Sequence, residues 1–157
     1  MESEWHNLSG AAVPDLPRML QELAASGDLS LHVGSDSKNR GDHTFFVLVV
    51  AIQRPGEGWR VVYRCLREKR MNQLADRLFR EAHLSIELAT EISGHLARPI
   101  VVHIDANPDE RHRSSRYARS LAGMGRGSGF EVRLKPDAWC ATCVADHVVK
   151  GKHVRAA

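Results

Sequence analysis

The spacing of hydrophobic and polar positions predicts the order of the elements in the first half of the chain. Apolar residues recur at helical spacing over residues 14–26, and Gly27 ends this predicted helix. Dense apolar runs predict strands over residues 29–36, 44–53 and 59–66, with a hairpin turn over residues 54–58. The first 13 residues have no clear period, so we expect them to be loose.

The second half of the chain alternates helical and strand patterns. Helical spacing covers residues 69–97 and 114–124, and strands are predicted over residues 100–105 and 130–134, before a last helix over residues 141–150. This order predicts an α/β fold: a five-stranded mixed sheet flanked by helices, its first three strands an antiparallel meander followed by two crossover units. The expected organisation is an N-terminal extension with one short helix (1–28), this domain (29–150) and a basic tail (151–157).

Three aspartates carry the clearest chemical signal. Asp36 and Asp105 end predicted strands, and Asp146 lies in the last predicted helix. The first and fourth strands should be parallel neighbours, so Asp36 and Asp105 should meet at one sheet edge, where open sheets bind ligands. Converging carboxylates repel one another unless a cation lies between them, and oxygen ligands of this kind suit Mg²⁺ or Mn²⁺. Each acid also has a simpler interpretation, as a turn residue for Asp36 and Asp105 or an exposed acid near a helix N-terminus for Asp146.

Short motifs around these aspartates resemble the ribonuclease H-like superfamily. The segments Gly34-Ser35-Asp36-Ser37, His103-Ile104-Asp105-Ala106-Asn107 and Val144-Ala145-Asp146-His147 are similar to its first-strand, fourth-strand and last-helix motifs. Within the superfamily the chain is most similar to the YkuK-like bacterial family of predicted nucleases, through the segments 123–130 and 135–137. The resemblance covers residues 29–150.

Sites of this superfamily usually take one glutamate from the first long helix, and Glu81, Glu87 and Glu91 are the candidates. At about 100° per residue, Glu81 falls within the apolar arc of the helix, whereas Glu87 and Glu91 fall on the opposite face. An acid within a sheet-facing stripe is costly unless it is paired or bound to a metal, which favours Glu81. Glu87 remains the alternative if the helix register drifts, and Glu81 could instead be a solvated residue at the rim of the stripe.

The resemblance implies a two-metal nuclease in which Asp36, Glu81, Asp105 and Asp146 are catalytic and hold Mg²⁺ or Mn²⁺. The expected partner is nucleic acid: RNA, an RNA/DNA hybrid or structured DNA. Lys38, Arg40 and Arg126 are candidates to bind its phosphates. A nucleic-acid-binding module with little or no catalysis is the alternative function. A junction substrate would require a dimer, and the sequence leaves the oligomeric state open.

Composition and charge only limit the class of protein that this chain can be. The chain has 157 residues, 43% of them hydrophobic and 26% charged, which fits one domain with a real core. No apolar run is long enough to cross a membrane, the N-terminus does not resemble a signal peptide, and three cysteines suit a reducing compartment, so we expect a cytoplasmic protein. The net charge of +3 is too small to indicate nucleic acid by itself. The five arginines between residues 111 and 126 form either a solvated helix face or a phosphate-binding surface.

A few other residues have two interpretations. Cys140 and Cys143 match the spacing of a redox motif, but no strand is predicted after them, which argues against a thioredoxin-like protein. The histidines show no paired spacing typical of zinc ligands, and His103 is expected to be a packed strand residue. Tyr117 and Trp139 could stack on bases if exposed, although apolar packing is the simpler expectation.

Overall fold

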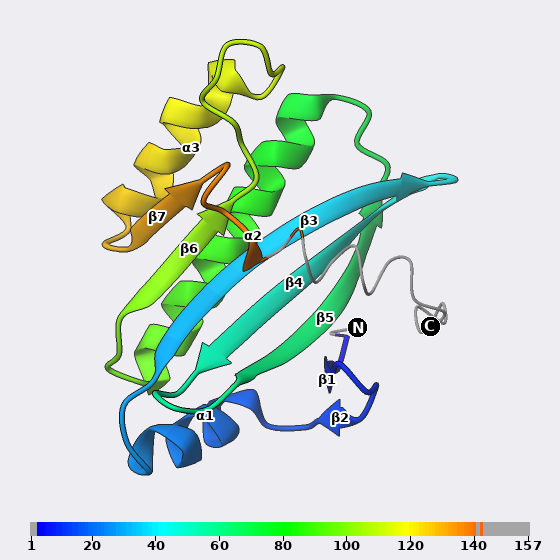
Figure 1. The fold of residues 1–157 in the computed structure, drawn as a ribbon. Coiled ribbons are helices and arrows are strands. Elements are labelled where there is room, and N and C mark those ends of the chain that lie inside the picture. The colour runs from blue at the N-terminus through cyan, green and yellow to red at the C-terminus, as the bar shows by residue number, and fades with distance from the viewer. Residues whose placement is uncertain (1–2, 141, 143–157) are drawn as a thin grey trace.

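Seven strands form one mixed sheet in the computed structural model, which describes residues 3–140 and 142 (Figure 1). Its order is β2-β1-β5-β4-β3-β6-β7. The five strands that carry the core are β3 (Ser30–Arg40), β4 (His43–Gln53), β5 (Trp59–Lys69), β6 (Ile100–Ile104) and β7 (Glu131–Leu134). The predicted five-stranded arrangement is therefore present, but it is only part of a larger sheet.

The strand directions agree with the predicted meander and crossovers. The strands β3, β4 and β5 pair antiparallel along their whole length, whereas β6 lies parallel to β3 and β7 lies parallel to β6. The hairpin between β3 and β4 closes from Arg40 to His43 through two residues, and Gly41 takes the left-handed backbone conformation that this turn needs, with φ of +53°.

Three helices, α1 (Leu16–Ala25), α2 (Leu74–His95) and α3 (Ser115–Gly127), pack against one face of the sheet. The start of α1 is fixed by Asp15, whose side chain accepts a hydrogen bond from the Arg18 N–H at 2.9 Å. The apolar stripe of α2 meets alternate residues of β3 and β4. No helix in the described part of the chain is long and apolar enough to cross a membrane.

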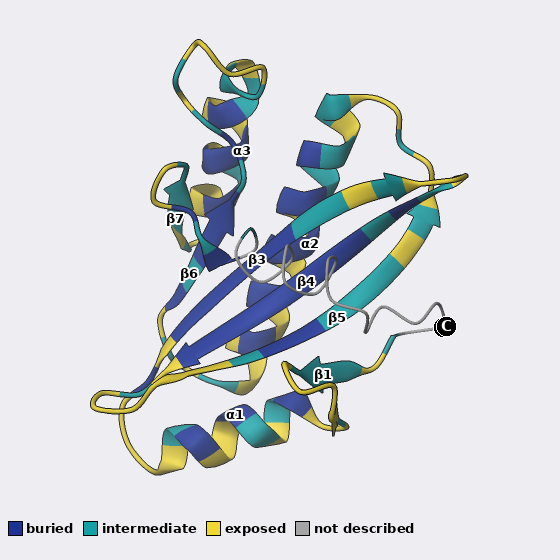
Figure 2. Ribbon diagram, turned by 45° about the vertical axis from the view of Figure 1, so that its right-hand side comes forward, coloured by how far each residue is buried: buried dark blue, intermediate teal, exposed yellow. Residues whose placement is uncertain are grey.

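The central strand β4 is covered on both faces, as its continuous apolar sequence predicts. Phe46, Leu48, Val50 and Ile52 belong to the main core beneath the helices. The residues between them, Val47, Val49 and Ala51, join a smaller cluster with Tyr63 and Cys140 on the opposite face. The dark blue of β3 and β4 in Figure 2 marks this doubly buried centre.

The N-terminal segment differs from the prediction. Residues expected to be loose form two short strands, β1 (Trp5–Asn7) and β2 (Ala12–Val13). In β1, His6 lies opposite Tyr63 and Asn7 lies opposite Val62, so β1 pairs with the edge that β5 would otherwise expose. Pairing with a long existing strand outweighs the weak local pattern of these residues, which is why the sheet has seven strands rather than five.

Several predicted boundaries were also wrong, two of them beside the candidate site or its supporting strands. The strand expected to end at Asp36 continues to Arg40, because its residues 37–40 pair fully with β4. Pairing along a hairpin satisfies the backbone there even though the side chains are polar. The helix expected to end at residue 124 continues to Gly127, and its Gly125 packs closely against Val132 of β7. The last predicted helix lies almost entirely outside the described residues.

Candidate active site

Asp36 and Asp105 lie on neighbouring parallel strands. The pairing of β3 with β6 runs from Leu31 opposite Ile100 to Gly34 opposite His103. Asp36 and Asp105 each follow two residues later, so continuing this register brings them side by side, just where β6 ends. Asp36 also lies opposite Val47, on the sheet face away from the three helices. The structure therefore places the two aspartates just beyond the last paired residues of adjacent parallel strands, and the charges of both act on Glu81.

Glu81 approaches the same place from α2, on the other face of the sheet. Its side chain is buried, with only 7% of the residue exposed. The hydroxyl of Ser37 donates a hydrogen bond to Glu81 Oε1 at 2.5 Å, and Ser35 donates one to the Glu81 carbonyl at 2.6 Å. Ser85 in turn donates to Ser35 at 3.1 Å. These serines hold α2 against β3 and fix Glu81 where the strands β3 and β6 separate.

The three carboxyl groups interact electrostatically. Burial, which is the largest cause, and the negative charges of Asp36 and Asp105 together raise the pKa of Glu81 to about 8. The hydrogen bond from Ser37 and the charge of Arg77 act in the opposite direction but do not prevail. Glu81 therefore holds a proton at neutral pH as long as no cation offsets the surrounding negative charge.

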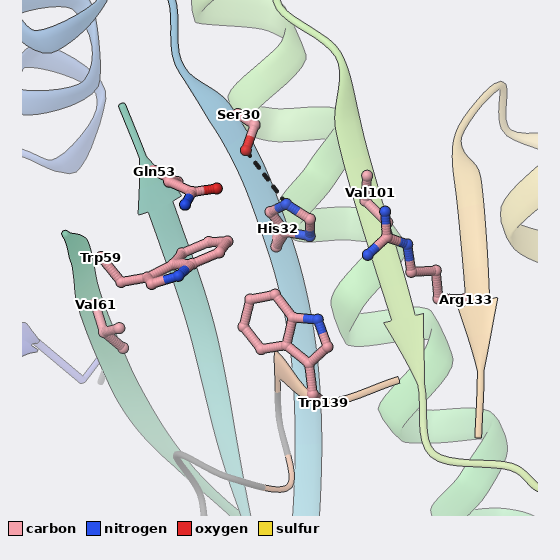
Figure 3. A pocket seen from close by; sticks show the side chains of 8 residues that line it. All are labelled: Ser30, His32, Gln53, Trp59, Val61, Val101, Arg133 and Trp139. Atoms are coloured by element: carbon pink, nitrogen blue, oxygen red, sulfur yellow. Dashed lines mark hydrogen bonds between the residues drawn. The ribbon is translucent and has the colours of Figure 1, made fainter. Parts of the chain in front are cut away.

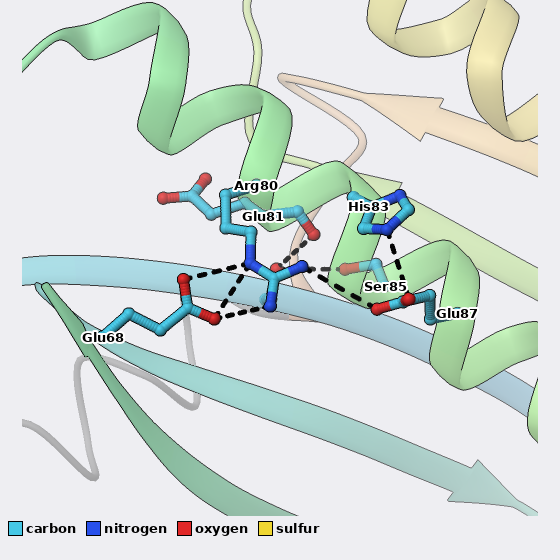
Figure 4. Close-up of polar contacts among 7 residues, drawn as sticks. Glu68, Arg80, Glu81, His83, Ser85 and Glu87 are labelled. Carbon is cyan, nitrogen blue, oxygen red and sulfur yellow. Dashed lines mark hydrogen bonds and ion pairs between the residues drawn. The ribbon is translucent and has the colours of Figure 1, made fainter. Parts of the chain in front are cut away.

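Glu87, the alternative glutamate, takes part in a different set of contacts. In Figure 4 the guanidinium of Arg80 lies between Glu68 and Glu87. Arg80 Nε donates to Glu68 at 2.9 Å, and Glu87 also meets His83 at 3.2 Å. The Glu87 side chain is 58% exposed, so it belongs to a solvated ion-pair network on the outer face of the helix.

Lys135 lies beside the three acids, and the sequence analysis did not identify it. It follows β7, and its ammonium group forms an ion pair with Asp105 Oδ1. Its backbone N–H donates to the Ala106 carbonyl at 3.1 Å, which fixes the approach of this segment to the end of β6. The pair joins residues far apart in the sequence, so no local motif could have revealed it. Lys135 offsets part of the negative charge at Asp105.

The donor chemistry of Asp36, Glu81 and Asp105 suits a hard divalent cation, because all of the ligands would be carboxylate oxygens. The raised pKa of buried Glu81 is also what a cation would reverse. Within residues 3–140 and 142, however, no three His, Cys, Asp or Glu side chains are arranged as a ready-made metal site. Binding would require Glu81 to lose its proton and Lys135 to release Asp105. The fourth predicted acid, Asp146, lies outside the described residues.

Two of the three predicted phosphate-binding residues lie near the acids. Lys38 and Arg40 are exposed and share the face of β3 that carries Asp36. Through the register of the meander, Lys38 lines up with Arg67 and Arg40 with Lys69, both exposed on β5. We call these four residues the basic patch. The sequence analysis missed its β5 half because it ended that strand at residue 66.

Arg126 does not join this group. It lies in the last turn of α3, which leads into β7 at Glu131. Glu131 pairs with Val101 near the start of β6, whereas Asp105 follows the end of β6. Arg126 is therefore at the opposite end of the parallel strands from the acids, and the structure does not bring them together.

A pair of buried histidines lies beside the acids on the same sheet face. His32 Nδ1 and His103 Nε2 are 2.9 Å apart, and the Trp139 backbone N–H donates to His103 Nδ1 at 3.2 Å. Burial, with the charges of His32 and Arg133, lowers the pKa of His103 to about 3, so the imidazole is neutral. His103 must then donate through Nε2 to His32, which leaves the His32 Nε2–H directed to Ser30 Oγ at 3.3 Å. His103 is thus a packed strand residue, as predicted.

Tyr117 and Trp139, the two candidates for stacking on bases, lie in different surroundings. Tyr117 packs edge-on against Phe79, with ring centroids 6.0 Å apart, so it belongs to the core region of α3. Trp139 packs among His32, His103 and Trp59 on the opposite face of the sheet. Cys140 is fully buried, and its thiol donates to the His32 carbonyl at 3.6 Å. Its possible redox partner, Cys143, lies outside the described residues.

Comparison with known protein families agrees with this arrangement of helices and strands. The model of the family described as Ribonuclease H-like matches residues 17–150. This chain therefore belongs to the ribonuclease H-like family. No curated protein matches the sequence. Nucleases of this family generally use divalent metals and act on nucleic acid, so the fold and the family together define a nuclease-like module.

Proposed function

We propose that this chain is a metal-dependent nuclease that hydrolyses phosphodiester bonds of RNA or structured nucleic acid. The observation that supports this most strongly is the meeting of Asp36 and Asp105 with buried Glu81, whose pKa both aspartates help to raise. An acidic cluster at the edge of a sheet is costly to maintain without a ligand. Its neighbourhood is also suitable for nucleic acid, because the basic patch lies on the same face as Asp36.

In this proposal Asp36, Glu81, Asp105 and Asp146 hold two Mg²⁺ or Mn²⁺ ions. Bound there, the ions would supply a hydroxide nucleophile at neutral pH and stabilise the charge of the leaving oxygen. The chain's own residues orient the reaction: Ser37 holds the Glu81 carboxyl, and Lys38 and Arg40 bind backbone phosphates without reading sequence. Lys135, which pairs with Asp105, would neutralise part of the charge of a phosphate bound there once Asp105 holds a metal ion.

A nucleic-acid-binding module with little catalysis is the second candidate. The observation that favours it is the internal balance of the cluster: Lys135 pairs with Asp105, and Glu81 holds a proton at neutral pH. With these charges offset, the fold does not require a metal. The basic patch would still bind nucleic acid in this case, so binding alone cannot separate the two functions.

Cleavage assays with single-stranded RNA, an RNA/DNA hybrid and a branched DNA junction separate them. We expect cleavage only with Mg²⁺ or Mn²⁺, and a loss of at least about a hundredfold for Asp36→Asn or Asp105→Asn, because each removes a ligand to the catalytic ions. Asp28→Asn is the matched control, since the Asp28 side chain is 90% exposed and lies away from the cluster. Binding without cleavage under either metal would overturn the nuclease proposal and establish the module.

A further inference from the structure

A second feature of the face that carries Asp36 is a cavity at the other end of β3. It has a volume of about 710 Å³ and is open to solvent. That size is in the range of small-molecule and nucleotide sites. Figure 3 shows the side chains around it; the lining residues are Ser30, His32, Gln53, Trp59, Val61, Val101, Arg133 and Trp139.

Three aromatic rings form the wall of this cavity, which we call the ring pocket. Trp59 and Trp139 meet edge to face with centroids 4.8 Å apart, and the His32 ring lies 5.3 Å from Trp59 and 5.1 Å from Trp139. Trp59 is 44% exposed, although a tryptophan loses favourable free energy by facing water. An exposed indole beside two held rings is a surface on which a planar ligand can stack.

Hydrogen bonds fix the His32 ring and the Trp139 backbone before any ligand arrives. The Trp139 backbone is tied to His103, His103 to His32, and His32 to Ser30, at distances of 3.2, 2.9 and 3.3 Å. This chain of hydrogen bonds sets the position of the Trp139 segment and the plane of the His32 ring. Ordering these groups in advance reduces the entropy that binding would otherwise cost.

The polar groups at the rim match a nucleotide. The Arg133 guanidinium extends over Val101 toward His32 in Figure 3 and places a positive charge at the pocket. Gln53 and Ser30 add amide and hydroxyl groups that can donate or accept hydrogen bonds to a base edge. Rings for stacking, a cation for phosphate and hydrogen-bonding groups for a base edge are together the means by which proteins bind unpaired nucleotides.

The ring pocket is in line with the acids and the basic patch. Ser30, His32, Asp36, Lys38 and Arg40 alternate onto the same face of β3. Asp36 lies four positions after His32, a distance of about 13 Å along the strand. This length corresponds to about four stacked nucleotides at roughly 3.4 Å each, and to fewer in an extended strand. Gly34 and His103, which lie between the ring pocket and the acids, are buried, and Trp139 packs over His103, so a nucleic-acid strand that reaches both features passes over the residues around Trp139.

We propose that the ring pocket binds an unpaired base of the nucleic-acid strand whose backbone crosses the acid cluster. This inference rests on the proposed function, because it takes the ligand to be nucleic acid. It narrows the predicted substrate. The nucleic acid must be single-stranded, or locally unpaired, a few nucleotides from the phosphodiester bond that lies at Asp36. Arg133 binds a phosphate of that nucleotide, and Trp59 stacks on its base.

Binding measurements test this independently of cleavage. The probe is a fluorescent single strand of about ten nucleotides, with an abasic strand of equal length and the corresponding duplex as comparisons. We expect Trp59→Ala to weaken binding of the single strand about tenfold or more, and to leave binding of the abasic strand unchanged. The control is Leu8→Ala, which removes another exposed apolar side chain that does not line the pocket. Unfolding midpoints verify that both variants fold.

The salt dependence of binding distinguishes the two contacts. Arg133→Gln should reduce the slope of log affinity against log salt by about 0.7, the value for one phosphate of a single strand, whereas Trp59→Ala should leave the slope unchanged. Intrinsic tryptophan fluorescence should be quenched by the single strand in the wild-type chain, and less so in the Trp59→Ala variant.

The outcomes separate this inference from the proposed function. Equal affinity of the wild-type chain and Trp59→Ala for the single strand would overturn the inference even if acid-dependent cleavage is present. Loss of affinity on Trp59→Ala without any metal-dependent cleavage would support the inference and overturn the nuclease. If Trp59→Ala instead converts a dimer to a monomer and strand affinity is unchanged, the pocket is a self-association surface and the inference fails.

Discussion

Replacing Glu81 with glutamine should make the protein more stable at neutral pH. The pKa of this carboxyl rises from 4.5 in the unfolded chain to about 8 in the folded one, with burial as the largest cause. Folding at pH 7 must therefore protonate a group that is ionised in the unfolded chain, which lowers the free energy of unfolding. At about 1.36 kcal/mol per unit, the pKa difference costs about 3 kcal/mol at pH 7.

The pH dependence gives the sign of the effect. A carboxyl whose pKa is raised by folding stabilises the fold most below pH 4.5, and this contribution declines as the pH rises from 4.5 to about 8. Glutamine is neutral throughout and can still accept the hydrogen bond from Ser37. Glu81→Gln should therefore match the wild-type chain near pH 4 and exceed it by about 3 kcal/mol at pH 7.

Urea unfolding followed by circular dichroism, in buffer with a metal chelator, measures this difference at each pH. Glu91→Gln is the matched control, because Glu91 is exposed on the same helix and its replacement should change stability by less than about 0.5 kcal/mol. In an Asp36→Asn background the gain should be smaller, since the Asp36 charge contributes to the raised pKa. Equal stabilities of Glu81→Gln and wild type at pH 7, or a difference independent of pH, would refute the reasoning.

Two further predictions concern the packed core. Folding lowers the pKa of His103 from 6.5 to about 3, so its stabilising contribution is complete above pH 6.5 and declines toward pH 3. Between pH 7 and pH 5, wild type should lose about 2 kcal/mol more stability than His103→Asn, measured by urea unfolding; equal losses would contradict this. Gly125→Ala should cost about 1–3 kcal/mol because its new methyl group would overlap Val132, whereas Gly123→Ala, with open space around it, should be neutral or stabilising by up to about 1 kcal/mol. Thermal unfolding measures both, and equal midpoints for the two glycine variants would contradict the packing argument.

The placement of Asp36, Asp105 and Glu81 could be predicted because each depends on a regular period. Parallel pairing of two apolar strands brings the residues after them to one edge, whatever the exact boundaries of those strands. The helical period of about 100° per residue then separates Glu81 from Glu87 on the same helix. Burial of Glu81 and exposure of Glu87 confirm that helix-face assignment, whereas their catalytic roles remain a prediction.

Other parts of the site depend on contacts that have no period in the sequence. Lys135 meets Asp105 because the segment after β7 returns past the end of β6, which only the tertiary structure determines. Arg67 and Lys69 were missed because the strand boundary was set by side-chain polarity, whereas backbone pairing with β4 extends β5 to Lys69. Trp59 likewise looked like an ordinary strand residue, since its ring partners His32 and Trp139 come from distant segments.

The two faces of β3 carry different functional groups, so the register of β3 with its neighbours determines every part of this surface. Ser35 and Ser37 face α2 and hold Glu81, while His32, Asp36 and Lys38 face the opposite side. A shift of one residue would exchange these two sets and would put an aspartate against the helix and serines at the ligand face. The continuous pairing of β3 with β4, from one end of the strand to the other, opposes such a shift. The two-residue turn between Arg40 and His43 fixes this pairing, and therefore keeps the acids, the basic patch and the ring pocket on one face of β3.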